Sequence, residues 1–233
     1  KLTEISELGE FGLIDRLTRD FPVRQPSTLK GVGDDAAVLE YKDTEVLVTT
    51  DLLLENVHFD LTYVPLMHLG YKSAVVNFSD IYAMGGTPRQ ITVSLGVSAR
   101  FTVEHLEELY AGIRRACEVY GVDLVGGDTS ASHQGLVISI TCIGDAPKGD
   151  VVFRDGARDT DLICVSGDLG AAYMGLQVLE REKVASAGMK DFQPDFAGKE
   201  YLIERQLKPE ARKDIIGFLR KEGVRPTSMM DVS

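Results

Sequence analysis

The chain has 233 residues, of which 44% are hydrophobic and 26% charged, proportions that are ordinary for a globular protein of one or two domains. Its net charge of -11 argues against a nucleic acid or an anionic membrane surface as a partner. No apolar run approaches the roughly 20 residues that cross a bilayer, and residues 1–17 do not resemble a signal peptide. We therefore expect a cytoplasmic protein.

Hydrophobic periodicity predicts a first unit in which helices and strands are mixed. The pattern of residues 102–120 is the clearest helix, with Thr102 as its N-cap and Gly121 as its C-terminal stop. Other patterns predict helices over residues 5–21 and 68–86, and strands over 46–53, 90–97, 122–128 and 136–144.

A second unit is predicted after the turn-rich, charged residues 145–161, which place a domain boundary near residue 150. Residues 162–182 read as a strand, a glycine loop and a helix, residues 199–222 mostly as helix, and residues 227–233 as the beginning of a strand. The expected fold class is α/β (α+β): a mixed-sheet N-terminal domain, residues 1–150, with flanking helices, plus the start of a second α/β domain, residues 151–233, whose remainder is absent.

Three cysteines lie far apart in apolar segments: Cys117, Cys142 and Cys164. Their odd number and wide spacing favour buried free thiols over a disulfide or a zinc site.

Aspartates recur at or near the ends of apolar segments, where this residue type is normally depleted. They are Asp34 and Asp35 in "GVGDDAAV", Asp51 in "VTTDLL", Asp80 in "NFSDIYAMGG" and Asp128 in "LVGGDTS", with Asp231 in "MMDVS" as a possible fifth group. Each one alone could cap a helix or begin a turn. Together they favour convergence, because open α/β sheets place ligands at strand ends.

Converging carboxylates repel each other, by about 4 kcal/mol for a pair 4 Å apart at a protein surface. They must therefore take up protons or hold cations, and the nearby hydroxyls of Thr49 and Thr50 add oxygen ligands that suit Mg²⁺. The glycine loop before Asp34 lacks the lysine of a Walker-type phosphate loop, so Mg²⁺ would supply the missing positive charge.

Four further side chains have both a functional and a structural interpretation. Lys72 and Arg154 could contact a phosphate, or could be a solvated lysine and a surface ion pair. His58 follows the Asp51 strand closely but could be structural, and Tyr110 lies beside the apolar stripe of its helix, where a core role is the default.

The order and spacing of these motifs resemble the thiamine-monophosphate kinase family, in the superfamily of aminoimidazole ribonucleotide synthetase. The resemblance runs from "GEFGLIDRL" through "TTDLLLENVHF", "YKSAVVNFSDIYAMGGTP", "LVGGDTS" and "VVFRDGA" to "SMMDVS". It implies an enzyme, a phosphotransferase that uses ATP and several Mg²⁺ ions to convert thiamine monophosphate to thiamine diphosphate. It also implies a homodimer paired through the N-terminal metal- and ATP-binding domain.

Carried over residue by residue, the resemblance implies three catalytic residues, Asp51, Asp80 and Asp128. The implied metal ligands are Asp35, Thr49, Thr50, Asp51, Asp80, Asp128 and Asp231. Tyr110, Gly127, Asp128, Arg154 and Ser233 would contact ATP, and His58 would contact the thiamine substrate. The family pattern normally continues past "MMDVS" into Asp-Gly-Leu and further contacts, which this chain does not include.

The expected mechanism is direct in-line phosphoryl transfer without a covalent intermediate, because a phosphate monoester is largely dianionic at pH 7 and needs no strong base. Two alternatives stay open: a related ATP-using synthetase of the same superfamily, and a non-catalytic acidic module that binds metal.

Overall fold

The computed structural model describes residue 12 and residues 25–30, 33–188 and 193–232. The helix predicted over residues 5–21 lies almost entirely outside these residues, and Ser233 lies outside them as well. Within the described residues, no helix is both long enough and apolar enough to cross a membrane.

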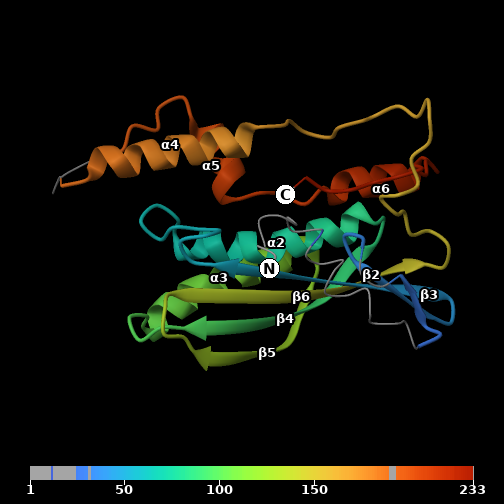
Figure 1. Cartoon of the computed structure of the whole chain (residues 1–233), viewed down its shortest axis with the longest axis horizontal. Helices are drawn as coiled ribbons and strands as arrows, with labels where there is room; N and C mark the ends of the chain where they lie inside the picture. Colours follow the sequence, from blue (N-terminus) through green and yellow to red (C-terminus); the bar gives the residue numbers. More distant parts are fainter. Residues whose placement is uncertain (1–11, 13–24, 31–32, 189–192, 233) are drawn as a thin grey trace, which may run out of the picture.

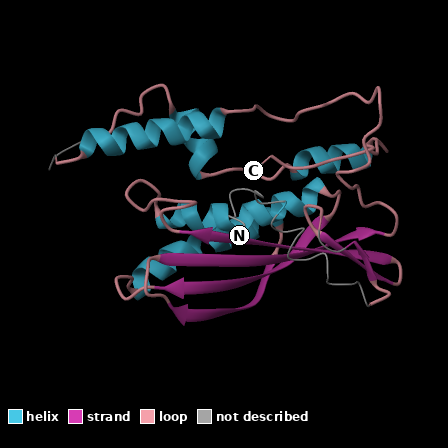
Figure 2. Cartoon of the chain, in the orientation of Figure 1, coloured by secondary structure: helices cyan, strands magenta, loops and turns pink. Residues whose placement is uncertain are grey.

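The first part of the chain folds into one six-stranded sheet with helices on one side (Figures 1 and 2). The strands lie in the order β1-β2-β3-β6-β4-β5, and only β4 and β5 run parallel. Their bounds are β1 Thr28–Lys30, β2 Ala37–Tyr41, β3 Thr44–Leu54, β4 Thr87–Val97, β5 Asp123–Ala131 and β6 Leu136–Pro147. The predicted fold class and all four strands predicted in this part are confirmed.

Successive side chains along β3 point to opposite faces of the sheet, and this alternation decides which of them face the helices. Leu47, Thr49 and Leu53 are buried, whereas the residues between them are half-buried or exposed, as expected for a strand with one covered face. The helix α2, Leu66–Ala83, covers this face, and α3, Val103–Tyr120, packs on α2. Among the described elements, no helix covers the opposite face of the sheet (Figure 1).

The predicted ends of α3 are confirmed. Thr102 is the N-cap, and its backbone N–H donates to Nδ1 of His105 at 3.2 Å. Gly121 ends the helix in the left-handed conformation, with φ of 72°, which glycine adopts without steric cost. α3 therefore begins and ends within one residue of its predicted limits.

The second part of the chain forms a further helical layer above α2 (Figure 1). It contains α4 Ala171–Ser186, α5 Glu200–Leu207 and α6 Lys213–Lys221. Ile216 of α6 is buried in the same core cluster as Phe78 of α2. The helices predicted in this part are confirmed, whereas the domain boundary near residue 150 stays a prediction.

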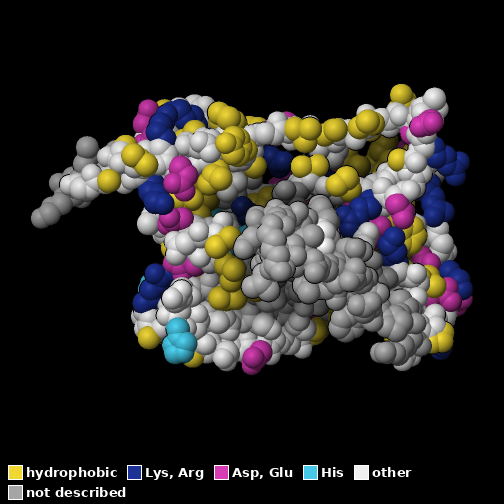
Figure 3. All heavy atoms as spheres, in the orientation of Figure 1, with side chains coloured by type: hydrophobic (Ala, Val, Ile, Leu, Met, Phe, Trp, Pro, Cys, Tyr) yellow, Lys and Arg dark blue, Asp and Glu magenta, His cyan; other side chains and the backbone are white. Residues whose placement is uncertain are grey.

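The strand predicted at the start of residues 162–182 is wrong in this structure. The segment is irregular, and Leu162 and Ile163 are 90% and 96% exposed. A strand needs neighbours for its N–H and C=O groups, and none of the described strands runs alongside. Figure 3 shows apolar side chains exposed along this part of the molecule. Residues 228–232 are likewise irregular.

The prediction for the cysteines is confirmed in part. All three thiols are free, and Cys142 is buried, but Cys117 is half-buried and Cys164 is exposed. Cys164 is exposed because it belongs to the irregular segment after residue 161 that has no neighbouring strand.

Candidate functional site

The centre of the site is the contact between β3 and the last turns of α2. Oγ1 of Thr49 donates a hydrogen bond of 2.6 Å to Oδ2 of Asp80. Asp51 is two residues further along β3 and so points to the same face of the sheet as Thr49. The helix and the strand therefore present Asp80 and Asp51 to one another.

In this group, the carboxyl of Asp80 has the largest shift in pKa. Burial raises the pKa of its carboxyl, and the negative charges of Asp51, Asp231 and Asp35 raise it as well. The hydrogen bond from Thr49 opposes this rise, and the resulting pKa is about 8. These three carboxylates come from β3, from the end of the chain and from the glycine loop. The acidic side chains predicted to converge are thus close enough to oppose each other's ionisation.

Asp35 and Asp231 lie at the edge of this group, and each leaves one buried carboxylate oxygen, Oδ2, without a hydrogen-bond partner. Burial raises the pKa of both carboxyls, and for Asp35 the charges of Asp231 and Asp34 add to the effect. Because an unpaired buried oxygen is costly, both oxygens are suited to accept a cation or a donor group.

Arg154 balances part of this negative charge. Its Nη1 lies 3.5 Å from Oδ1 of Asp35, and its Nε lies 3.7 Å from Oδ1 of Asp34 and donates to the backbone oxygen of Gly33 at 3.3 Å. The Asp34 and Asp35 side chains are only 0% and 10% exposed. Arg154 therefore does not form a surface ion pair but holds residues 33–35 against the second part of the chain.

The donor chemistry of this group fits Mg²⁺, which binds carboxylate and hydroxyl oxygens. Asp35, Asp51, Asp80, Asp231 and Thr49 supply such oxygens, and two of them are unpartnered. No three His, Cys, Asp or Glu side chains in the described part of the chain lie at metal-coordinating distance from one another. The carboxylates thus form a loose group that would have to tighten around an ion.

His58 follows β3 and lies beside the acidic group. The backbone N–H of Leu54 donates to Nδ1 of His58 at 3.0 Å. Burial and the charge of Asp231 raise the pKa of Asp51, and the charge of His58 opposes this rise. His58 also lines a cavity of about 300 Å³, together with residues of α2, α4 and α5. The cavity is thus lined by the residue for which the resemblance predicts a substrate contact.

Two of the predicted metal ligands do not join the group within one chain. Thr50 points to the uncovered face of the sheet, where its Oγ1 donates to the backbone oxygen of Ile140 and accepts from Thr141, both at 3.1 Å. Asp128 is exposed on β5. Asp51 and Asp128 are on strands separated by β6 and β4, which puts their backbones about 14 Å apart at roughly 4.8 Å a strand.

The predicted ATP contacts are likewise dispersed. Gly127 is exposed beside Asp128 on β5, whereas Tyr110 is half-buried on α3 and packs against the core, where burial raises the pKa of its hydroxyl. Of this set, the structure brings only Arg154 to the acidic group, and Ser233 lies outside the described residues.

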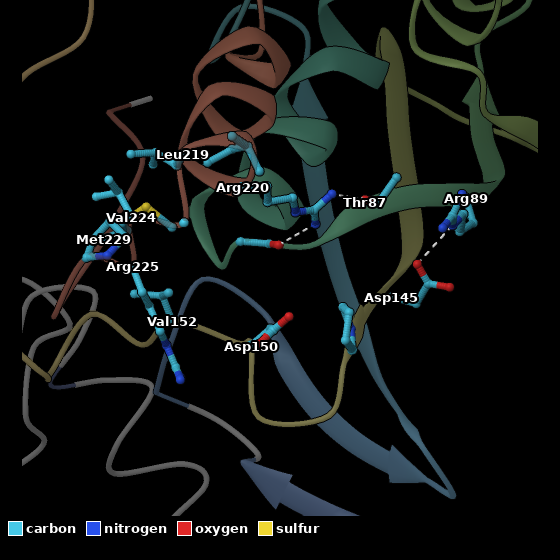
Figure 4. A pocket seen from close by; sticks show the side chains of 15 residues that line it. Thr87, Arg89, Asp145, Asp150, Val152, Leu219, Arg220, Val224, Arg225 and Met229 are labelled. Atoms are coloured by element: carbon cyan, nitrogen blue, oxygen red, sulfur yellow. Dashed lines mark hydrogen bonds and ion pairs between the residues drawn. The ribbon is translucent and has the colours of Figure 1, made fainter.

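A larger cavity, of about 520 Å³, lies between the start of β4, the end of β6 and α6 (Figure 4). Its arginines are already engaged: Arg220 donates to Oγ1 of Thr87 at 2.9 Å and to the backbone oxygen of Gly85 at 2.6 Å, and Arg89 donates to Asp145 at 2.9 Å. None of the predicted site residues lines this cavity.

Several polar contacts of the site were not predicted. Tyr63 and Asp60, from the loop after β3, bind Glu180 and Lys183 of α4. These partners are more than 100 residues apart in the chain, and no motif marks them. Lys72, for which a solvated position is the alternative interpretation, is half-buried beside the same loop and α5.

Comparison with known proteins gives a consistent result. Residues 33–146 match the family described as AIR synthase related protein, N-terminal domain. Curated thiamine-monophosphate kinases of Aquifex aeolicus and Bacillus subtilis are 38% and 34% identical, over 98% and 89% of this chain. The matches cover 68% and 62% of those two proteins, so this chain spans about two thirds of their length.

Solved structures agree with the sequence relatives. A structure described as AaThiL complexed with AMPPCP and TMP is 37% identical, with a TM-score of 0.79, over 94% of this chain and 65% of that one. A thiamine-monophosphate kinase structure from Stenotrophomonas maltophilia K279a is 32% identical, with a TM-score of 0.66, over 92% and 65% of the two chains. This chain therefore belongs to the thiamine-monophosphate kinase family.

Proposed function

We propose that the protein transfers the γ-phosphate of ATP to thiamine monophosphate and so forms thiamine diphosphate. The observation that carries this proposal is the acidic group, in which the charges of Asp35, Asp51 and Asp231 raise the pKa of Asp80. The charge of Asp231, from the other end of the chain, also raises the pKa values of Asp35 and Asp51. A site of this kind suits two phosphate-bearing substrates that approach through divalent cations. The solved relative described with AMPPCP and TMP supports both substrates.

The predicted metal ligands remain Asp35, Thr49, Thr50, Asp51, Asp80, Asp128 and Asp231. Bound Mg²⁺ would neutralise the charge of the phosphates and of the carboxylates together. Asp80 from α2 and Asp51 from β3 would hold the ions, and both side chains come from elements that belong to the core. Thr49 orients Asp80 through its hydrogen bond.

The transfer is direct and in line. The acceptor phosphate is largely dianionic near pH 7, since the second pKa of a phosphate monoester is about 6, so no side chain has to remove a proton. Arg154 would release part of its interaction with Asp34 and Asp35 to contact the ATP phosphates. His58 contacts the acceptor, and Tyr110, Gly127, Asp128 and Ser233 lie against ATP.

We further propose a homodimer, paired through the sheet face that none of the described helices covers. The edge strand β5 is exposed along its whole length, including Leu124 and Val125 at 46% and 58%. Exposed apolar side chains on an unpaired sheet edge favour association. ATP as co-substrate favours the cytoplasm as its location.

The test is product analysis with the full-length protein, ATP, Mg²⁺ and thiamine monophosphate. We expect thiamine diphosphate and ADP in equal amounts, and no product when thiamine monophosphate is replaced by unphosphorylated thiamine. Hydrolysis of ATP without thiamine diphosphate would instead favour a related synthetase. Binding of Mg²⁺ without any binding of ATP would favour a non-catalytic acidic module. Either result overturns the proposal.

A further inference from the structure

The cavity of about 300 Å³ beside His58 lies between the loop that follows β3 and three helices. Asn56, His58 and Tyr63 of the loop form one wall, and residues of α2, α4 and α5 form the others. His58, which lines the cavity, also acts through its charge on the carboxyl of Asp51 in the acidic group. The cavity is therefore large enough and close enough to hold a small organic group attached to a reacting phosphate.

Two contacts fix the loop wall against α4. Oη of Tyr63 donates to Oε1 of Glu180 at 2.6 Å, and Nζ of Lys183 donates to Oδ2 of Asp60 at 2.7 Å. Nζ of Lys183 also lies 3.6 Å from Oε2 of Glu180 and 5.9 Å from the centre of the Tyr63 ring. We call these four residues the wall contacts; each carboxylate in them has a donor.

Lys72 is different, because its charge has no carboxylate partner among the described residues. Its Nζ donates only to the backbone oxygen of Gln206, at 3.2 Å, and burial lowers the pKa of the amine. Lys72 lines the cavity at the end formed by α5. A half-buried ammonium next to empty space is suited to a hydrogen-bond acceptor on a ligand.

The distance along α2 gives the orientation of such a ligand. Lys72 and Asp80 are eight residues apart on this helix, which corresponds to about 12 Å at 1.5 Å a residue. An extended thiamine monophosphate is of this length, with its phosphate at one end and a pyrimidine ring, whose nitrogens accept hydrogen bonds, at the other. With the phosphate at the acidic group, the pyrimidine ring reaches Lys72.

We propose that this cavity receives the organic part of the acceptor, that Lys72 binds its pyrimidine ring, and that the wall contacts hold the cavity open in the required shape. The inference rests on the proposed function and adds the residue that selects the acceptor. The positive thiazolium ring then lies near Asp60 and Glu180, and Lys72 acts as a specificity residue that makes no contact with the transferred phosphoryl group.

The experiment compares Lys72→Met, Lys72→Arg and the control Lys221→Met, which removes an equal charge from an exposed position at the end of α6. We expect Lys72→Met to raise KM for thiamine monophosphate roughly tenfold to a hundredfold, the value of a hydrogen bond to a charged group. KM for ATP and kcat stay unchanged, Lys72→Arg recovers most of the loss, and Lys221→Met resembles the wild type.

A truncated acceptor, the corresponding N-methylthiazolium monophosphate, keeps the positive ring but lacks the pyrimidine ring and so isolates the contact. It should bind more weakly to the wild type, and Lys72→Met should cause no further loss with it. Titration calorimetry of each variant with thiamine monophosphate alone gives a second measurement that needs no turnover, and circular dichroism confirms the fold. An unchanged KM in Lys72→Met, or an equal loss with both acceptors, overturns the role of Lys72.

The wall contacts are tested by Tyr63→Phe and Lys183→Met, each of which should raise KM for thiamine monophosphate severalfold at an unchanged KM for ATP. Wild-type KM in both variants removes the wall contacts from the proposal. If the wild-type protein itself makes no thiamine diphosphate, it is the proposed function that fails. If it does and Lys72→Met is normal, only the assignment of the cavity fails.

Discussion

Asp80 is the side chain on which the acidic group depends, because three other carboxylates act on it and Thr49 donates to it. The change Asp80→Asn keeps the shape of the side chain and removes its charge. We expect turnover to fall by roughly a hundredfold or more, the usual loss when a charge-stabilising group is removed. Steady-state kinetics measures this fall.

The matched control is Asp155→Asn, which removes a carboxylate that is 68% exposed and pairs with Lys30 at 3.3 Å. Exposed ion pairs of this kind contribute little, so both activity and stability should stay at the wild-type level. Near-normal turnover in Asp80→Asn would contradict the assignment of Asp80 to the catalytic group, provided that Asp155→Asn is also normal.

The raised pKa of Asp80 also predicts how stability depends on pH in the absence of divalent cations. The folded protein holds this proton up to a pKa of about 8, whereas the unfolded chain releases it near the ordinary value of 3.8. Between these values the folded state binds more protons, so the free energy of unfolding decreases as pH rises. The melting temperature should therefore fall from pH 5 to pH 8.

Melting curves of the wild type and of Asp80→Asn, recorded in chelator across this range, separate the effect of Asp80 from that of other groups. The variant should show a smaller decrease, and millimolar Mg²⁺ should raise the melting temperature of the wild type most at pH 8, where binding to ionised carboxylates favours the folded form. Parallel pH curves for the two proteins would refute the shift assigned to Asp80.

At the scale of elements, the position of Asp80 depends on how closely α2 and α3 cross. A Cβ at Gly70 would lie 1.9 Å from the backbone oxygen of Leu109, and a Cβ at Gly112 would lie 1.9 Å from that of Met67. Neither backbone atom can move without shifting a helix. The two glycines thus permit the close approach of these helices that keeps α2 on the sheet.

We expect Gly70→Ala to lower the free energy of unfolding by about 1–3 kcal/mol, as overpacking of a core does. The control is Gly217→Ala in α6, where a Cβ would meet no atom within 4 Å and where alanine should add about 0.5–1 kcal/mol of stability through its helix preference. Urea denaturation measures both changes. A loss of stability in Gly217→Ala equal to that in Gly70→Ala would contradict a steric cause.

The same elements show what a sequence can predict. The strands β3, β4 and β6 and the helices α2 and α3 follow from local periodicity and caps, since each buries one face of its own pattern. Residues 162–166 carry a strand-like pattern but form no strand, because strand formation also requires a neighbour. Local patterns predict an element; they do not supply its partner.

The candidate site follows the same rule. The closeness of Asp35, Asp51, Asp80 and Asp231 was predictable from recurring aspartates at the ends of apolar segments. The separate position of Asp128 was not, because the strand order β3-β6-β4-β5 inserts two strands between it and Asp51. The wall contacts were also not predictable, since Tyr63 and Glu180 are brought together only by the packing of α4 over the loop.

At the scale of the whole molecule, Asp128 lies about 14 Å from the site across the sheet, three steps of roughly 4.8 Å from strand to strand. Two aspartate side chains and one ion do not span that distance. Asp128 is exposed on β5, at the edge of the sheet through which we propose that two copies pair. In such a homodimer Asp128 of one copy would complete the acidic group of the other.

Mixed dimers test this arrangement, because they separate residues that act within one chain from residues that act across the pair. We expect Asp80→Asn and Asp128→Asn each to have very low activity alone. A dimer of one copy of each has one site with both aspartates intact only if Asp128 acts on the partner. Half of the dimers in an equal mixture are of this kind and each has one such site, so about a quarter of the wild-type activity should return on refolding the two together. An inactive mixture whose dimers have formed normally would place Asp128 in the site of its own chain and would require β5 to move toward β3.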